Sequence, residues 1–545
     1  MKTTFSLLLR SVPAIVLATL VTMAQVFAAA GDLDPTFASA GSVSPYAPPG
    51  LKRFLAGSPA QSLMTAATLQ SDGRILTASW CGIPAGGFYD FCLNRLLSDG
   101  SFDASFGTSG FASTSGGEGY PSGIAVDTRN DIWVSGSCAS YGCVHKFSSS
   151  GGHYINVGVN GRVTVPGMYD ISSVAASGDG KIVVGGRCVG TPIPPLPPNT
   201  AIYYPCVARL NLDGTMDATF NSGVIRQWGD DPFTGAMLRD GQTIKLVVRP
   251  DGRIYAANMC DLGSQAGTTA NKAMCLAIIE ANGSISPIYF GPGDVSYFYV
   301  TYFANTTMRL VADMAVQSDG AAVLTGSCLP TAGGTVGCST RIIPDVGVDQ
   351  GFGVNGALTT TLGFGSTSIG GVLLREDGSM VMAAQCIVSI ITFQHEGICL
   401  AAYNSSGAPL GSFSGGASTR LIDIESSAPH SVPASVWRGG RTLRVGSGGS
   451  SAFLTYGGCL TNVPVYNSCI AKISLAETSG KSCSADVDGN GAVNATSDGL
   501  MLMRALLGLS GTAVTQGVAA PGAPRATWPA VRDFLGAHCD LAVAP

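Results

Sequence analysis

The feature that most constrains how this 545-residue chain folds is a unit that recurs along most of its length. Each copy has a short apolar segment, a turn that usually contains Asp-Gly, and a second segment rich in β-branched residues. The copy with Ser71-Asp72-Gly73-Arg74 at its turn is among the clearest. Asp-Gly favours tight hairpin turns because it tolerates positive φ. Each copy is therefore predicted to form a β-hairpin.

Seven copies of this hairpin predict an all-β fold, a seven-bladed β-propeller that spans residues 31–475. Two strands alone cannot bury an apolar face, so the copies must pack on one another. Their length of roughly 50–70 residues leaves room for three or four strands each, as in a propeller blade. The alternative is a linear β-solenoid, whose coils are usually shorter and more regular than these.

The two ends of the repeat region complement each other. Gly31–Phe37 has the sequence of a repeat tail with no hairpin before it. The seventh copy is weaker, with its second strand predicted at Thr442–Val445, and it ends at Ile473 without a tail. We expect the N-terminal segment to complete the last blade, which closes the ring and removes exposed sheet edges.

Together these motifs resemble the delta-60 repeat family, whose copies read as an apolar run, DGKILVAG and then RLNxDGSLDxxFG. The best matches are Asp179–Gly186 with Ala208–Phe220, and the Asp72 copy with Asn94–Gly107. The resemblance covers about residues 31–475. It implies a β-propeller-like array on a secreted or surface bacterial protein, and it implies no specific activity.

The 16 cysteines are predicted to form sequential disulfide bonds. In the repeats, the first cysteine of a pair ends the strand after the turn and the second begins the next strand. Neighbouring antiparallel strands bring such residues within disulfide reach. The alternative is thiolate metal binding, for which Cys138 and Cys143 have the closest spacing. The predicted pairs are Cys81–Cys92, Cys138–Cys143, Cys188–Cys206, Cys260–Cys275, Cys328–Cys338, Cys386–Cys399, Cys459–Cys469 and Cys483–Cys539.

Residues 1–30 are predicted to be a signal peptide. Lys2 and Arg10 precede the apolar stretch Val12–Val26, and small residues follow it. The alternative is an uncleaved N-terminal anchor, but the apolar stretch is short for a membrane span, and no later run is long enough. The predicted location is secreted, periplasmic or at the cell surface. A net charge of −5 argues against a nucleic-acid partner, because it provides no basic surface.

The repeat pattern ends before a predicted linker, residues 476–482. Residues 483–540 are predicted to form a small helical module. Its first part is similar to the calcium loop of dockerin and EF-hand modules. The resemblance places Ca²⁺ ligands at Asp486, Asp488, Asn490, the carbonyl of Ala492, Asn494 and Asp498.

The calcium loop departs from the family pattern at its last ligand. Position 12 is Ser497, so Asp498 would close a loop of 13 residues. An exiting helix is predicted over Leu500–Leu509, and a second helix is predicted to begin near Thr527, with Cys483–Cys539 holding the module shut. The alternative is an ordinary acidic surface turn. A paired dockerin would need a second Asp-rich loop, and Thr512–Thr527 contains none.

No catalytic motif emerges from the sequence. The five histidines have no metal-ligand spacing, and neither a GxSxG elbow nor a phosphate-binding loop occurs. Three function classes remain: a binding scaffold, a carbohydrate-active enzyme or accessory protein, and a structural or adhesive surface protein. The first is favoured, with an unknown protein or glycan partner on a propeller face. The dockerin-like tail adds a cohesin-like partner as a further candidate.

Overall fold

The structure is a computed structural model with two compact units, one formed by residues 31–411 and 417–475 and one that includes residues 476–545. They are called here the propeller and the C-terminal module. The residues it describes are 30–38, 50–54, 63–85, 88–115, 119–138, 141–190, 202–223, 226–227, 238–262, 272–291, 294–296, 299–301, 303, 306–331, 333–362, 367–375, 377–387, 396–411, 413, 418–422, 441–445, 451–461, 463–475, 486–490, 494–519 and 522–539. The predicted signal peptide and linker therefore lie outside the described residues, apart from Ala30.

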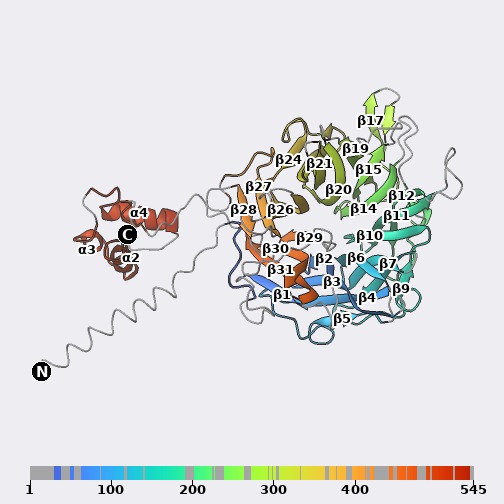
Figure 1. The fold of residues 1–545 in the computed structure, drawn as a ribbon, viewed down its shortest axis with the longest axis horizontal. Coiled ribbons are helices and arrows are strands. Elements are labelled where there is room, and N and C mark those ends of the chain that lie inside the picture. Colours follow the sequence, from blue (N-terminus) through green and yellow to red (C-terminus); the bar gives the residue numbers. More distant parts are fainter. Residues whose placement is uncertain are drawn as a thin grey trace. The chain divides into compact units, whose positions relative to one another are not determined.

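The propeller has seven blades, each an antiparallel sheet, arranged in a ring (Figure 1). Blades 1 to 3 are β2–β5 (Leu63–Leu69, Ile75–Ala85, Phe88–Leu96, Phe111–Ser113), β6–β9 (Tyr120–Val126, Ile132–Cys138, Tyr141–Phe147, Arg162–Thr164) and β10–β13 (Met168–Ala176, Ile182–Gly190, Ile202–Leu210, Arg226–Gln227). A 3-10 turn, η1 (Asn221–Gly223), precedes β13.

The remaining blades follow the same order of strands. Blade 4 is β14, β15, β16 and β19 (Leu238–Val248, Ile254–Leu262, Lys272–Ile279, Tyr299–Thr301), with a separate hairpin of β17 and β18 (Ile288–Gly291, Asp294–Ser296). Blade 5 is β20–β24 (Thr306–Val316, Ala322–Pro330, Val336–Ile343, Gly347–Val348, Ala357–Thr360), and blade 6 is β25–β28 (Ser368–Leu374, Met380–Ile387, Glu396–Tyr403, Thr419–Ile422). Blade 7 is β29–β31 (Arg441–Val445, Ser451–Thr461, Val463–Ser474) with β1 (Leu51–Phe54) as its outer strand.

The first strand of each blade lies innermost, next to the first strands of the neighbouring blades. All seven first strands therefore begin on one face of the ring. On that face each second strand ends and each third strand begins, and the disulfide bonds lie there, so it is called the disulfide face. Buried apolar side chains from neighbouring blades form the core between them, for example Leu76 and Phe91 of blade 1 with Ile132 and Val134 of blade 2.

The ring closes as the complementary ends predict. β1 pairs antiparallel with β31, with Leu51 opposite Ala471. The segment before β1 also pairs with β31, because the amide of Gly31 donates to the carbonyl of Ser474 at 2.7 Å and Ser474 donates back to Asp32 at 2.9 Å. Phe37 is buried against Phe453, with ring centroids 5.6 Å apart. The seven-bladed propeller is therefore confirmed, including its closure by both ends of the chain.

The repeated turns use Asp and Gly in different ways. The amide of Gly73 donates to the carbonyl of Gln70, and Gln70 donates to the carbonyl of Arg74, so three residues span the turn. Gly73 has φ of 82°, whereas Asp72 has no positive φ. The carboxylate of Asp72 instead accepts a hydrogen bond from the amide of Arg74 at 3.0 Å. Glycine therefore supplies the left-handed conformation, and aspartate caps the turn with its side chain.

Six disulfide bonds join the second and third strands of blades 1 to 6. Their Cα atoms are 5.7–6.0 Å apart. The bonded cysteines are diagonal neighbours, since Cys188 lies opposite Tyr204 and Cys206 opposite Gly186. Cys469 is also disulfide-bonded. The side chain of Cys459, residue Cys483 and the side chain of Cys539 lie outside the described part of the chain.

One strand of blade 7 differs from its predicted position. Thr442–Val445 was expected to be the second strand of the seventh hairpin. It belongs instead to β29, the innermost strand, and β30 is the second strand. The physical reason is that this copy lacks the Asp-Gly turn that locates five of the other hairpins, so its register could not be read from the sequence.

The described residues of the C-terminal module form three helices: α2 (Asp498–Leu506), α3 (Thr512–Thr515) and α4 (Trp528–Cys539). Met501 and Ala505 of α2 pack with Val531 and Leu535 of α4, and all four are buried. Leu506 and Leu507, at the end of α2, are exposed. Within the described residues of both units, no helix is long and apolar enough to cross a membrane.

Candidate functional site

The C-terminal module brings three carboxylates together. One oxygen from each of Asp486, Asp488 and Asp498 lies within 4.8 Å of the others. Asp488 and Asp498 are almost completely buried. Asp486 and Asp488 belong to the loop, whereas Asp498 is the first residue of α2. The start of this helix therefore places the residue after Ser497 in the carboxylate cluster, and the Ser497 hydroxyl donates to Asp498 at 3.2 Å.

Backbone groups hold this cluster in place. The two carboxylate oxygens of Asp498 accept hydrogen bonds from the amides of Asp488 and Asn494, at 3.0 and 2.9 Å. Burial alone would raise the pKa of Asp498, but these hydrogen bonds outweigh it and the pKa is lowered. The Asp498 carboxyl group is therefore kept deprotonated, which is the form in which a carboxylate binds a metal cation.

Arg525 fixes the other side of the loop. Its guanidinium donates to the carbonyls of Val487 and Asp486, at 2.8 and 2.6 Å, and its amide donates to the carbonyl of Asp488. The guanidinium also lies 4.0 Å from the ring centroid of Phe534. Arg525 thus links the loop to α4: it binds the backbone carbonyl groups of the loop and contacts the Phe534 ring of α4.

The other three predicted ligands differ in how they lie relative to the carboxylate cluster. The side chain of Asn490 donates to Asp488 at 3.1 Å, so it lies beside the cluster. The side-chain oxygen of Asn494 accepts hydrogen bonds from Thr496. Ala492 lies outside the described residues. Three clustered carboxylates are a donor set that suits a hard divalent cation, and Ca²⁺ tolerates irregular geometry better than Mg²⁺ does.

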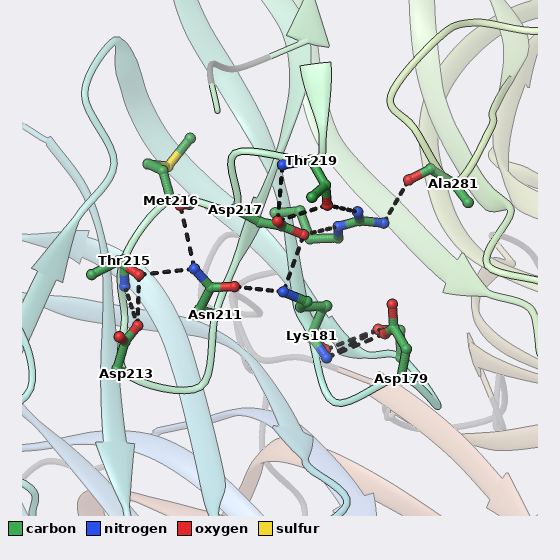
Figure 2. A network of polar contacts seen from close by, with 11 residues as sticks. Asp179, Lys181, Asn211, Asp213, Thr215, Met216, Asp217, Thr219 and Ala281 are labelled. Atoms are coloured by element: carbon green, nitrogen blue, oxygen red, sulfur yellow. Dashed lines mark hydrogen bonds and ion pairs between the residues drawn. The ribbon is translucent and has the colours of Figure 1, made fainter. Parts of the chain in front are cut away.

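In the propeller, the polar residues shared by the repeats join neighbouring blades. Asp217 accepts hydrogen bonds from Arg209 at 2.7 Å and from the hydroxyl and amide of Thr219, and Lys181 lies 3.5 Å away (Figure 2). Arg209 also donates to the carbonyl of Ala281 in blade 4, at 2.6 Å. Hydrogen bonds from Thr219 and Arg209 outweigh the effect of burial, which would raise the pKa of Asp217, and lower that pKa to about 2.

The same arrangement recurs in two other blades and is called here the interblade joint. In each, an arginine binds an aspartate of its own blade, stacks on a buried phenylalanine and donates to a carbonyl in the turn of the next blade. The joints consist of Arg95, Asp103 and Phe106; Arg209, Asp217 and Phe220; and Arg341, Asp349 and Phe352. These aspartates therefore have a structural role.

His145 is a buried histidine next to the Cys138–Cys143 disulfide. Its Nε2 lies 3.6 Å from the sulfur of Cys138, and its Nδ1 lies 3.3 Å from Nε2 of His153. Because both sulfurs are in the disulfide bond, this group offers no thiolate to a metal. Burial first, and then repulsion from His153 and Arg162, lowers the pKa of His145 to about 3.

Sequence reasoning missed a group of aromatic side chains on the disulfide face. Trp80, Tyr89 and Tyr120 form one cluster of tilted rings, with ring centroids 4.4 and 5.4 Å apart. Tyr169 and Tyr203 form another, at 4.7 Å. A signal for them existed, since several lie within three residues of a repeat cysteine. Their convergence, however, depends on strands that are not consecutive in one blade, as for Tyr169 and Tyr203, or that belong to two blades, as for Tyr89 and Tyr120.

Comparisons with known proteins agree with the fold. Residues 70–106 and 203–220 match the model of a β-propeller domain of unknown function, DUF5122. They also contain two of the three interblade joints, so the matched sequence is the part that holds blades together. No curated protein matches the chain.

Solved structures resemble the chain at low sequence identity. A protein of unknown function from Dyadobacter fermentans is 11% identical, with a TM-score of 0.39, covering 78% of this chain and 100% of its own. The polysaccharide lyase Uly1 is 9% identical, with a TM-score of 0.38, covering 81% and 95%. An aldose sugar dehydrogenase from Streptomyces coelicolor, bound to PQQ, is 13% identical, with a TM-score of 0.36, covering 65% and 94%.

Proposed function

We propose that this chain is a secreted or cell-surface binding scaffold, in which the propeller carries a recognition face and the C-terminal module binds one Ca²⁺. The observation that carries the proposal is a division of roles among the residues. Residues shared by the repeats hold the blades together, whereas aromatic side chains that the repeats do not share gather on the disulfide face. The disulfide bonds indicate an oxidising compartment, which agrees with export.

The test is to incubate the purified chain with a panel of extracellular polysaccharides and proteins, and to measure both retention and product formation. We expect retention of a partner without any change in its length. Sustained release of reducing ends or unsaturated sugars by catalytic amounts of the chain would overturn the proposal in favour of a carbohydrate-active enzyme.

The calcium part of the proposal rests on the carboxylate cluster. The proposed ligands are the side chains of Asp486, Asp488, Asn490, Asn494 and Asp498 and the carbonyl of Ala492. We expect affinity in the range of extracellular modules, with a Kd of about 10⁻⁴–10⁻³ M. Because the cation would neutralise buried carboxylates and order the loop, Ca²⁺ should raise the melting temperature of the module.

Titration calorimetry and thermal unfolding of the full chain check this prediction. Asp486→Ala and Asp498→Ala should each abolish the heat of binding and the gain in stability. Ser497→Ala should retain both, and so should Asp533→Ala, which removes an exposed carboxylate of α4. Absence of heat and of stabilisation at millimolar Ca²⁺ would make the loop an ordinary acidic turn. Loss of binding with Ser497→Ala but not with Asp498→Ala would indicate a 12-residue loop, with Ser497 as its last ligand.

A further inference from the structure

The exposed apolar side chains on the disulfide face have an unusual composition. Among the described residues of that face, the large exposed ones are Tyr120, Tyr141, Tyr169, Val189 and Leu421, the last opposite Cys399 of the blade 6 disulfide. The first four belong to blades 2 and 3, and three of them are tyrosines. Tyrosine combines an apolar ring with a hydroxyl group, so it suits a surface that binds a partially polar ligand in water.

The tyrosines of blade 3 surround a paired charge. The guanidinium carbon of Arg187 lies 5.3 Å from the ring centroid of Tyr169 and 5.2 Å from that of Tyr203. Its Nε donates to Asp170 at 2.7 Å. The side chains of Arg187 and Asp170 are 30% and 16% exposed, so both can be reached from solvent.

The exposed tyrosines of blade 2 lie apart from this group. Tyr141 is 63% exposed at the start of β8. It lies opposite Cys138, so its side chain is on the side of the sheet that packs against blade 1. Tyr120, at the start of β6, contacts Tyr89 of blade 1.

We propose that the tyrosine surface of blade 3, consisting of Tyr169, Tyr203, Asp170 and Arg187, binds a neutral polysaccharide. Sugar rings present apolar C–H faces that stack on aromatic rings and hydroxyl groups that bond to a carboxylate and a guanidinium. Because Asp170 already neutralises Arg187, the surface offers no net positive charge to an acidic sugar. This inference rests on the proposed function and names the ligand class and its place.

A protein partner fits the surface less well. A stable protein interface buries about 800 Å² on each side around an apolar centre. Among the described residues of the disulfide face, Val189 and Leu421 are the large exposed aliphatic side chains, and they belong to different blades. Instead, the Asp170–Arg187 ion pair lies beside the tyrosine rings. Such a mixed surface is expected where a ligand carries alternating apolar and polar groups.

Affinity electrophoresis and titration calorimetry with the full chain test this assignment. The probes are soluble β-glucan, mannan, xylan and starch as neutral polymers, with alginate and polygalacturonate as acidic ones. We expect at least one neutral polymer to bind more tightly than both acidic ones. The double variant Tyr169→Ala/Tyr203→Ala should lower the affinity at least tenfold, which is about 1.4 kcal/mol. Tyr169→Phe, which keeps the ring, should retain most of the binding.

The matched control is Val346→Ala/Val354→Ala, which removes two exposed side chains that lie away from the disulfide face and should leave binding unchanged. Unchanged melting temperatures would show that all variants are folded. Equal binding by the wild type and the double tyrosine variant would overturn the site but not the scaffold function. Retention of an extracellular protein with no polysaccharide bound would overturn the ligand class alone, and turnover of a polymer would overturn the proposed function itself.

Discussion

At the scale of single residues, His145 links the stability of the propeller to pH. The side chain is completely buried, against Phe91, His153 and the Cys138–Cys143 disulfide. In the unfolded chain its pKa is near 6.5, whereas in the folded protein it is lowered to about 3. The carbonyl of Gly161 opposes this shift, but burial and the neighbouring His153 and Arg162 outweigh it.

The sign of the effect follows from these two pKa values. Between pH 6.5 and 3 the unfolded chain binds a proton at His145 that the folded protein does not, so stability falls as the pH is lowered through this range. At pH 5 the expected loss is about 2 kcal/mol. His145→Gln should flatten the dependence of the melting temperature on pH between 7 and 4. Parallel curves for the wild type and the variant would show that the histidine does not cause the loss.

At the scale of elements, the interblade joint explains why an arginine, an aspartate and a phenylalanine recur at fixed spacing. Arg209 satisfies a buried carboxylate within its own blade and a carbonyl of the next blade at the same time. The amide of Asn221, which follows Phe220, also donates to the carbonyl of Asn282 in blade 4 at 2.8 Å. The tail of each such repeat is therefore a connector to the next blade.

Removal of the arginine from a joint should be costly. Arg209→Met leaves Asp217 buried without its guanidinium, and the expected loss is about 3–5 kcal/mol in the free energy of unfolding. The double variant Arg209→Met/Asp217→Asn should recover part of that loss. Arg253→Met removes the exposed pair with Glu280 and should cost less than about 1 kcal/mol. Denaturant unfolding measures all three, and equal losses for Arg209→Met and Arg253→Met would contradict the role of the joint.

Local signals account for what could be predicted from the sequence. The Asp-Gly turns locate five hairpins, and the repeat tails locate both ends of the ring. In blade 7, Thr442–Val445 was assigned to the second strand instead of the first because the turn of this copy lacks that signal. The tyrosine surface could not be predicted, because it depends on the register of three strands of blade 3. The buried position of His145 could not be predicted, because it depends on how blade 2 packs against blade 1. The cluster of Asp486, Asp488 and Asp498 was predictable, since loop spacing and the start of a helix determine it.

At the scale of the whole molecule, the propeller is a ring that its two ends hold closed. The carboxylate of Asp34 lies 2.9 Å from the amine of Lys472, in the position that the Arg–Asp pair occupies in the interblade joints. The amide of Ala38 donates to the carbonyl of Asp99 in blade 1 at 2.7 Å. The N-terminal tail thus connects blade 7 to blade 1 in the way that other tails connect their blades.

This arrangement makes the N-terminal tail decisive for the stability of all seven blades. Phe37→Ala removes a buried ring from the contact between blades 7 and 1 and should lower the free energy of unfolding by about 3–5 kcal/mol. Deletion of residues 31–38 should lower it further, because the backbone hydrogen bonds to β31 are lost as well. Thr36→Ala, at an exposed position whose bonds are to Asp34 alone, should have an effect below about 1 kcal/mol. Because the ring is continuous, the deletion should also reduce amide-exchange protection in blades 1 and 7 first. A melting temperature that is unchanged by the deletion would mean that the ring is held closed without this strand.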